Sequence, residues 1–169
     1  PHKPRFIAGS MGPTNKQLSI AGNVADPGHR DVTFDEMVAC YREQVEALLE
    51  GGVDLLLAET AFDTLVLKAA LFAIEEAFQS TGIAVPIMAS FTVFEGGRTL
   101  SAQTVEACFQ SISHANIISA GINCALGPEK LRPYLADLSR ICPAMVSCYP
   151  NAGLPNALGG FDETPEMMA

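Results

Sequence analysis

The chain has 169 residues, of which 49% are hydrophobic and 17% are charged, so it is neither disordered nor fibrous and has the length of one globular domain. Its 19 acidic and 10 basic side chains give a net charge of −9 without a cluster of lysines or arginines, which argues against a nucleic-acid partner. No apolar run approaches the ~18 residues that span a bilayer, so we expect no membrane partner either.

Five short apolar runs have the length of β-strands, at residues 5–10, 54–60, 85–93, 116–124 and 144–150. They are too continuously apolar for strands with one face in water, which indicates buried parallel strands.

Four helical patterns lie between these runs, over residues 34–50, 64–81, 102–115 and 128–141. Thr33 and Glu36 form a capping box for the first helix. Asp63 can cap the second helix and Ser101 the third, while Pro128 suits the first turn of the fourth. The chain therefore alternates strictly between strand and helix.

Strict alternation leaves two architectures, an open doubly wound sheet or a (β/α)8 barrel. No strand is followed by a Gly-x-Gly-x-x-Gly turn, which argues weakly against the first. A closed barrel takes about 250 residues, so five strands would be a partial TIM barrel that lacks about three βα units. The chain also starts without Met and stops at "DETPEMMA", as an internal fragment would. We expect residues 1–169 to be part of a single barrel domain.

Polar residues follow the apolar strands at the end where, in both architectures, active sites lie. Glu59 ends the second run, Asn123 and Cys124 end the fourth, and Asn151 follows the fifth. We expect these four residues to share a polar site. Taken alone, Glu59 could equally cap a helix or pair with a cation, and Cys124 could be a buried small hydrophobe.

The five cysteines are odd in number and form no CxxC pair, which is typical of reduced thiols in the cytoplasm. Apart from Cys124, we expect them all to be core residues, at positions 40, 108, 142 and 148.

Several motifs in family order resemble the homocysteine-binding barrel of cobalamin-dependent methionine synthase, in the homocysteine S-methyltransferase family: "AGSMGPTN", "GGVDLLLAETAFDTLVLKAA", "GRTLSAQT", "GINCALGPEKLRPYLADLS" and "YPNAGLPNA". The likeness to betaine- and S-methylmethionine-dependent homocysteine methyltransferases is weaker. The resemblance implies a (β/α)8 barrel, of which the first strand and the last strand or strands are absent here.

The resemblance also implies a zinc ion held by three cysteines. Cys124 matches the first of them, and the other two form an adjacent pair that would lie beyond residue 169. Glu59 matches the carboxylate that binds the amino group of homocysteine. Asn151 resembles an asparagine that reaches zinc when substrate is absent, and Asn123 would orient the strand tip.

The implied reaction is methyl transfer from methylcobalamin to the homocysteine thiolate, which gives methionine. Methylcobalamin and folate would be bound by other modules of the full-length chain, and we expect the 169 residues alone to be inactive and poorly stable. Two alternatives remain open. The methyl donor could be betaine or S-methylmethionine, or the chain could be a metal-free βα-repeat binding domain in which Cys124 is only a core residue.

Overall fold

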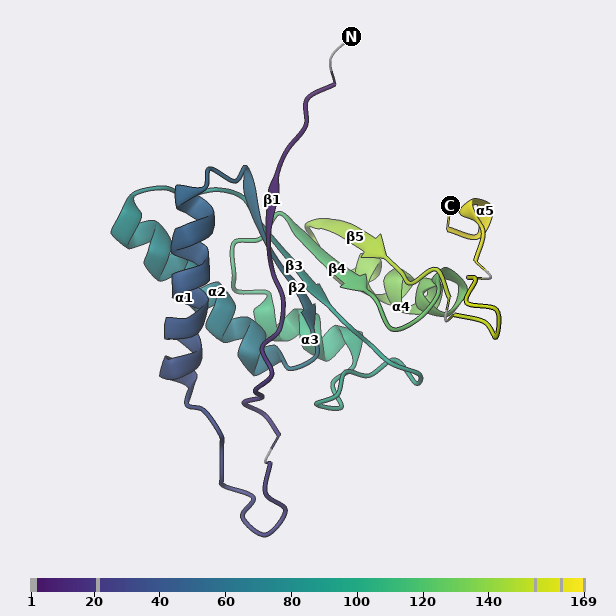
Figure 1. The fold of residues 1–169 in the computed structure, drawn as a ribbon, viewed down its shortest axis with the longest axis horizontal. Helices are drawn as coiled ribbons and strands as arrows, with labels where there is room; N and C mark the ends of the chain where they lie inside the picture. Colours follow the sequence, from purple (N-terminus) through teal and green to yellow (C-terminus); the bar gives the residue numbers. More distant parts are fainter. Residues whose placement is uncertain (1–2, 21, 154, 162, 169) are drawn as a thin grey trace.

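The computed structural model describes residues 3–20, 22–153, 155–161 and 163–168. Five parallel strands form one sheet in the order β1-β2-β3-β4-β5, and a helix follows each strand (Figure 1). The strands are β1 (Ala8–Met11), β2 (Leu55–Ala61), β3 (Ile87–Phe91), β4 (Ser119–Asn123) and β5 (Met145–Tyr149). The helices are α1 (Phe34–Glu50), α2 (Thr64–Thr81), α3 (Val105–Ile112), α4 (Pro128–Ile141) and α5 (Pro165–Met168).

The order of the strands distinguishes the two architectures that the sequence left open. A doubly wound sheet reverses its strand order at a switch point, whereas the strands of a barrel follow one another around the sheet. Here every neighbour in the sheet is also the next strand in the chain. The predicted partial TIM barrel is therefore confirmed.

Local signals set the ends of α1 and α2. The Thr33 hydroxyl accepts from the Glu36 N–H, and the Glu36 carboxylate accepts from the Thr33 N–H at 2.8 Å, which completes the predicted capping box. The Asp63 carboxylate accepts from the Leu65 N–H at 2.9 Å, and Gly82 ends α2 in the left-handed conformation that glycine favours. Both helices have their predicted bounds.

The predicted start of α3 at Ser101 is wrong. Thr104 caps the helix instead, and α3 covers only Val105–Ile112. The Ser101 hydroxyl is engaged elsewhere, because it donates to the Phe62 carbonyl at 3.2 Å and lies 3.0 Å from the Thr99 hydroxyl. Residues before Thr104 thus belong to a loop that folds back over the end of β2. Every strand except β2 is also shorter than its apolar run; at β1, for example, Phe6 and Ile7 lie exposed outside the sheet.

The hydrophobic core lies between the sheet and its helices. Ala58, Ala89 and Ala120 stand side by side in register on the covered face and are buried. Their small side chains leave room for larger apolar side chains from α1 and α2, which pack against each other on one side of the sheet (Figure 1).

Among the helices of the described residues, none combines the length and the apolar character needed to cross a membrane.

The opposite face of the sheet is richer in short and polar side chains. Because side chains alternate along a strand and parallel partners point the same way, the register places Ser90, Gly121 and Ser147 in one row of this face and Asn123 with Tyr149 in another. A Cβ at Gly121 would lie only 2.7 Å from the backbone carbonyl oxygen of Ser147, so glycine fits there and a larger residue does not. In a closed barrel this face would be the interior.

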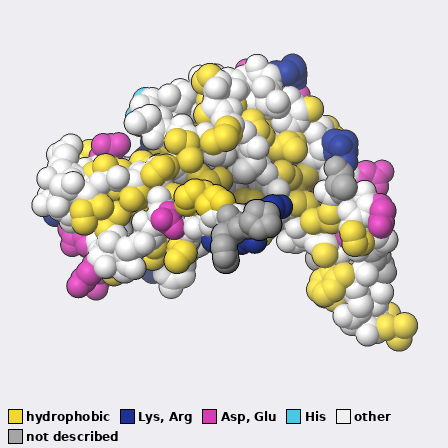
Figure 2. Space-filling view, turned by 90° about the horizontal axis from the view of Figure 1, so that it is seen from above, with side chains coloured by type: hydrophobic (Ala, Val, Ile, Leu, Met, Phe, Trp, Pro, Cys, Tyr) yellow, Lys and Arg dark blue, Asp and Glu magenta, His cyan; other side chains and the backbone are white. Residues whose placement is uncertain are grey.

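The end of the sheet where the strands begin is apolar. Figure 2 shows hydrophobic side chains gathered on this side of the molecule. Among the large apolar residues near the strand starts, Phe6, Ile7, Ile118 and Met145 are all exposed. The polar candidate residues lie at the other end.

Two of the cysteine predictions are wrong. Cys108 is buried as expected, and Cys142 is half-buried against the core. Cys40 is exposed because the buried stripe of α1 passes through Met37 and Tyr41 and leaves it on the outer side. Cys148 is exposed because it lies on β5, which has a strand neighbour on only one side within the described residues.

A candidate substrate site at the carboxyl ends of the strands

The site begins with an irregularity in β2. Ala58 pairs with Ala89 and Ala61 pairs with Phe91, so Glu59 and Thr60 together oppose the single residue Ser90. This is a β-bulge, a feature that often re-aims side chains beside active sites. Thr60 has φ 58°, a conformation that β-branched residues rarely adopt and that needs support from its surroundings.

Asn123 at the end of β4 provides that support. Its fully buried side-chain oxygen accepts from the Thr60 N–H at 3.1 Å and from the Ser90 hydroxyl at 2.6 Å. Its Nδ2 donates to the Thr60 hydroxyl at 2.8 Å and lies 3.1 Å from the Cys124 sulfur. All the hydrogen-bonding capacity of the amide is therefore used, and one side chain links the tips of β2, β3 and β4.

Cys124 follows β4 in a left-handed backbone conformation, with φ 59°, and Ala125 after it has φ 55°. Its N–H donates to the Tyr149 carbonyl at 3.2 Å, and its sulfur accepts the hydrogen bond from Asn123. The side chain is half-buried rather than enclosed in the core. This strained, hydrogen-bonded and accessible position differs from that of a cysteine that only fills space.

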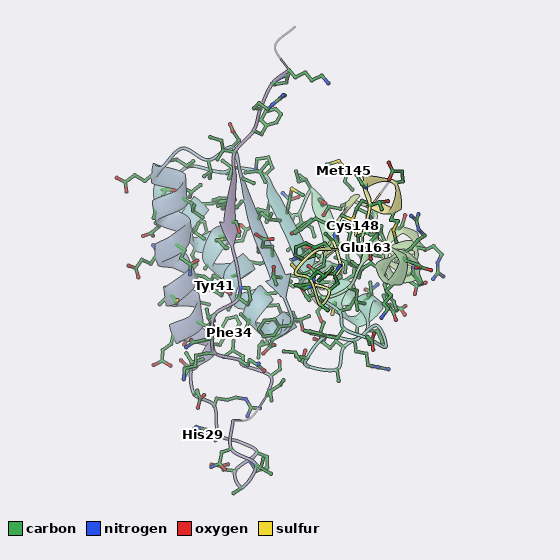
Figure 3. All side chains as sticks on the ribbon, turned by 45° about the vertical axis from the view of Figure 1, so that its right-hand side comes forward. His29, Phe34, Tyr41, Met145, Cys148 and Glu163 are labelled. Atoms are coloured by element: carbon green, nitrogen blue, oxygen red, sulfur yellow. The ribbon has the colours of Figure 1, made fainter. Side chains whose placement is uncertain are left out.

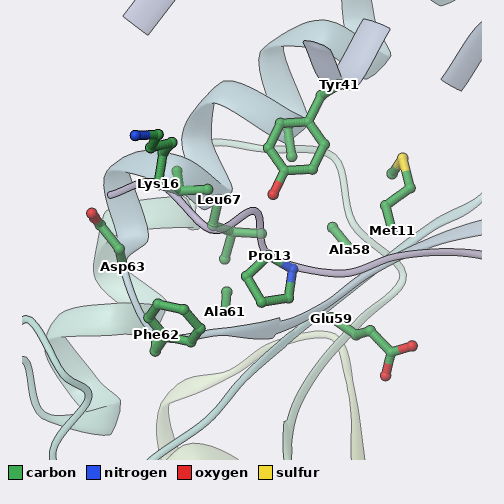
Figure 4. A pocket seen from close by; sticks show the side chains of 12 residues that line it. Met11, Pro13, Lys16, Tyr41, Ala58, Glu59, Ala61, Phe62, Asp63 and Leu67 are labelled. Atoms are coloured by element: carbon green, nitrogen blue, oxygen red, sulfur yellow. The ribbon is translucent and has the colours of Figure 1, made fainter. Parts of the chain in front are cut away.

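Glu59 is half-buried, and the Ser10 hydroxyl donates to its carboxylate from the neighbouring strand β1. Figure 4 shows the carboxylate directed away from Tyr41, Leu67 and Asp63, which lie on the other side of β2. Asp63, not Glu59, caps α2, and in the part of the chain that the structure describes no lysine or arginine forms an ion pair with Glu59. Neither helix capping nor pairing with a cation, the two alternatives suggested by the sequence, therefore explains the position of the Glu59 carboxylate.

Asn151 lies just beyond β5 and is half-buried. Its N–H donates to the Leu126 carbonyl at 3.1 Å, so the loop after β5 is joined to the loop after Cys124. The structure therefore joins Asn123 and Cys124 by a hydrogen bond and places Glu59 next to Thr60, which Asn123 also contacts, while Asn151 lies beside this group through its backbone.

Tyr149 was missed by the sequence analysis. Its hydroxyl is buried and forms no hydrogen bond of regular geometry among the described residues, although the Ser90 hydroxyl and the Glu59 carboxylate lie near it. Burial raises the pKa of Tyr149, and the nearby Glu59 carboxylate and Cys124 thiol raise it further, while the Ser90 hydroxyl acts in the opposite direction. Ser10, Thr60 and Ser90 were likewise not predicted as site residues. Their common sequence signal is a hydroxyl at the carboxyl end of an otherwise apolar strand.

The described residues contain no group of three His, Cys, Asp or Glu side chains that could hold a metal ion. Cys124 can supply one sulfur ligand, because its sulfur is half-buried and already oriented by Asn123. His29, by contrast, lies far from the sheet in the loop between β1 and α1 (Figure 3). A zinc site that uses Cys124 therefore needs further ligands besides those described here.

Sequential βα units with strained, polar strand ends define this chain as part of an enzyme-type (β/α)8 barrel. The sequence model of the family described as homocysteine S-methyltransferase matches residues 1–169, so the chain belongs to that family.

Two solved structures with the same fold are forms of the homocysteine methyltransferase MmuM from Escherichia coli. The apo form is 23% identical, with a TM-score of 0.65, over 88% of this chain and 50% of that one. The metallated form is 24% identical, with a TM-score of 0.66, over 88% of this chain and 49% of that one. The chain thus spans about half the length of these enzymes.

Proposed function

We propose that this chain carries part of the homocysteine site of a zinc-dependent homocysteine S-methyltransferase. In this proposal Glu59 binds the ammonium group of homocysteine, and Cys124 is one of the sulfur ligands of zinc. The observation that carries the proposal is the hydrogen-bonding of Asn123, which fixes the bulge beside Glu59 and the sulfur of Cys124 at the same time. The family match and the metallated relative support it.

Each residue has a defined part in binding. Glu59 presents a carboxylate with no cationic partner among the described residues, which suits an ammonium group. Cys124 lies two strands away, at the tip of β4. Two strand spacings are about 10 Å, a span that an amino acid with a side-chain thiol can bridge between a carboxylate and a metal ligand. Asn123 positions both ends, and Asn151 borders the site.

When bound, zinc would act as a Lewis acid that keeps a thiol of ordinary pKa about 8.5 deprotonated near neutral pH. The residues of this chain contribute orientation: Glu59 holds the amino end of the substrate, so that the sulfur end is presented beside Cys124. The remaining metal ligands would come from the rest of the barrel domain.

The motifs "GINCALGP" and "PNAGLPNA" lead us to propose methylcobalamin as the methyl donor and methionine as the product. Methylcobalamin and folate would then be bound by other modules of a full-length cytoplasmic methionine synthase.

The test is homocysteine binding by the full-length protein, measured by titration calorimetry with Glu59→Gln and, as a matched control, Glu106→Gln on the exposed side of α3. Losing a charge-assisted contact to the ammonium group should weaken binding by about 10- to 100-fold, with the zinc content unchanged. The control should bind as the unaltered protein does. Unchanged homocysteine binding in Glu59→Gln would refute the role of Glu59, and loss of zinc would make it a metal or structural residue.

A further inference from the structure

We propose that the hydroxyl of Tyr149 is a specificity-determining group of the site, which accepts a hydrogen bond from the substrate ammonium group together with Glu59 and Ser10. This inference rests on the proposed function, because it assigns a further contact to the same substrate.

The position of Tyr149 follows from the sheet. It is the last residue of β5 and pairs in register with Asn123, so both side chains lie on the face opposite the helices. Its hydroxyl is buried and forms no hydrogen bond of regular geometry among the described residues, although the Ser90 hydroxyl and the Glu59 carboxylate lie near it. A buried hydroxyl without a partner destabilises a protein, and such groups are uncommon in folded structures unless they have a functional use.

The surroundings of the hydroxyl are negatively charged or neutral. The Glu59 carboxylate, the Ser90 hydroxyl and the Cys124 sulfur all lie close to the Tyr149 hydroxyl. The O–H of Tyr149 can donate to Glu59 or Ser90, which leaves the lone pairs of its oxygen available to accept. A positively charged ligand is the group that this arrangement favours.

The number of acceptors matches a primary ammonium group, which has three N–H donors. The Glu59 carboxylate is the first acceptor. The Ser10 hydroxyl uses its hydrogen to donate to Glu59, so its oxygen can accept a second N–H. The Tyr149 oxygen is then the third acceptor. These three acceptors together recognise the ammonium group of an amino thiol, and they do not favour a thiol that lacks an amino group.

The experiment compares two ligands, homocysteine and 4-mercaptobutanoate, which has the same thiol and carboxylate but no amino group. Both are titrated into the full-length, zinc-loaded protein and into its Tyr149→Phe variant. We expect homocysteine affinity to fall by about tenfold, as for one lost hydrogen bond to a charged group, and 4-mercaptobutanoate affinity to stay the same.

Two further variants sharpen the test. Tyr134→Phe is the matched control, since Tyr134 lies on α4 against Gly97, and it should change neither affinity. Ser10→Ala removes the second acceptor at an exposed position and should reduce homocysteine affinity selectively, as Tyr149→Phe does.

The outcomes separate the inference from the proposed function. Unchanged homocysteine affinity in Tyr149→Phe, or an equal loss for both ligands, would overturn the role of Tyr149 and leave the homocysteine site in place. The equal loss would instead make the hydroxyl a structural group that contacts the rest of the barrel. If the unaltered protein binds neither thiol, the proposed function fails, and this inference fails with it.

Discussion

The tips of β2, β3 and β4 and the tip of β5 form two regions of the same site that differ in how their polar groups are satisfied. At β2 to β4, the Asn123 amide bonds to three residues and holds Thr60 and Cys124 in left-handed conformations. At β5, the hydroxyls of Ser147 and Tyr149 form no hydrogen bond of regular geometry among the described residues. The first region is therefore preorganised, whereas the second presents groups whose partners we assign to substrate and to further parts of the barrel.

This difference explains how the single side chain of Asn123 can influence both the proposed substrate contact at Glu59 and the proposed metal ligand Cys124. Glu59 and Cys124 do not bond to each other, yet Asn123 fixes the backbone next to one and the sulfur of the other. A substitution in the preorganised region should therefore affect protein stability, zinc binding and substrate binding together. A change at β5 should affect only recognition of the substrate.

The largest expected effect is that of Cys124→Ala. The variant should lose stoichiometric zinc and methyl transfer, because it removes a sulfur ligand at a position that no other described cysteine can replace. Metal analysis of the purified full-length protein measures the effect. Cys40→Ala is the matched control, since Cys40 lies exposed on α1, and it should keep its zinc. A Cys124→Ala protein with full zinc content would show that Cys124 is not a ligand.

Asn123→Ala should destabilise the protein by about 2–5 kcal/mol, because it leaves buried donors at Thr60 and Ser90 without an acceptor and opens a cavity. The free energy of unfolding in urea measures this. Asn116→Ala, at an exposed position before β4, should change stability by less than about 0.5 kcal/mol. Equal stability of the two variants would mean that Asn123 does not support the bulge.

Asp63 gives a smaller, pH-dependent effect. Burial alone would raise the pKa of Asp63, but hydrogen bonds from the Ser19 hydroxyl and from the N–H groups of Ser19, Leu18 and Leu65 outweigh it and lower the pKa. A carboxyl with a lowered pKa in the folded state contributes stability above its unfolded pKa of about 3.9 and loses it as the pH falls through the folded value.

Asp63→Asn should therefore cost about 1–2 kcal/mol at pH 7 and progressively less below about pH 4. Urea unfolding at pH 7 and pH 3 measures the difference. Asp35→Asn, at an exposed position in the first turn of α1, is the control and should show little change. A cost that stays constant over this pH range would contradict the lowered pKa of Asp63.

The sequence predicted most accurately those features whose determining contacts lie between residues close together in the chain. The bounds of α1 and α2 follow from Thr33, Glu36 and Asp63, whose capping contacts lie within three residues along the chain. The predicted start of α3 was wrong because the Ser101 hydroxyl contacts Phe62, which lies 39 residues away in sequence. Strand order required the structure, because both candidate architectures share the same alternation of elements.

The candidate site was predictable in part for the same reason. Glu59, Asn123 and Cys124 were recognisable from their place at the ends of apolar strands. The bulge at Thr60 was not, because it depends on the register between β2 and β3 and gives a β-branched residue a positive φ. Tyr149 was missed because its proximity to Glu59 depends on how the sheet brings β5 and β2 together on one face.

The most direct test of the account is zinc X-ray absorption of the full-length protein before and after addition of homocysteine. We expect the number of sulfur ligands around zinc to increase by one when homocysteine binds, and Cys124→Ala to have too little zinc for the experiment. Zinc whose sulfur ligands do not change with homocysteine, or that persists without Cys124, would contradict the proposed site.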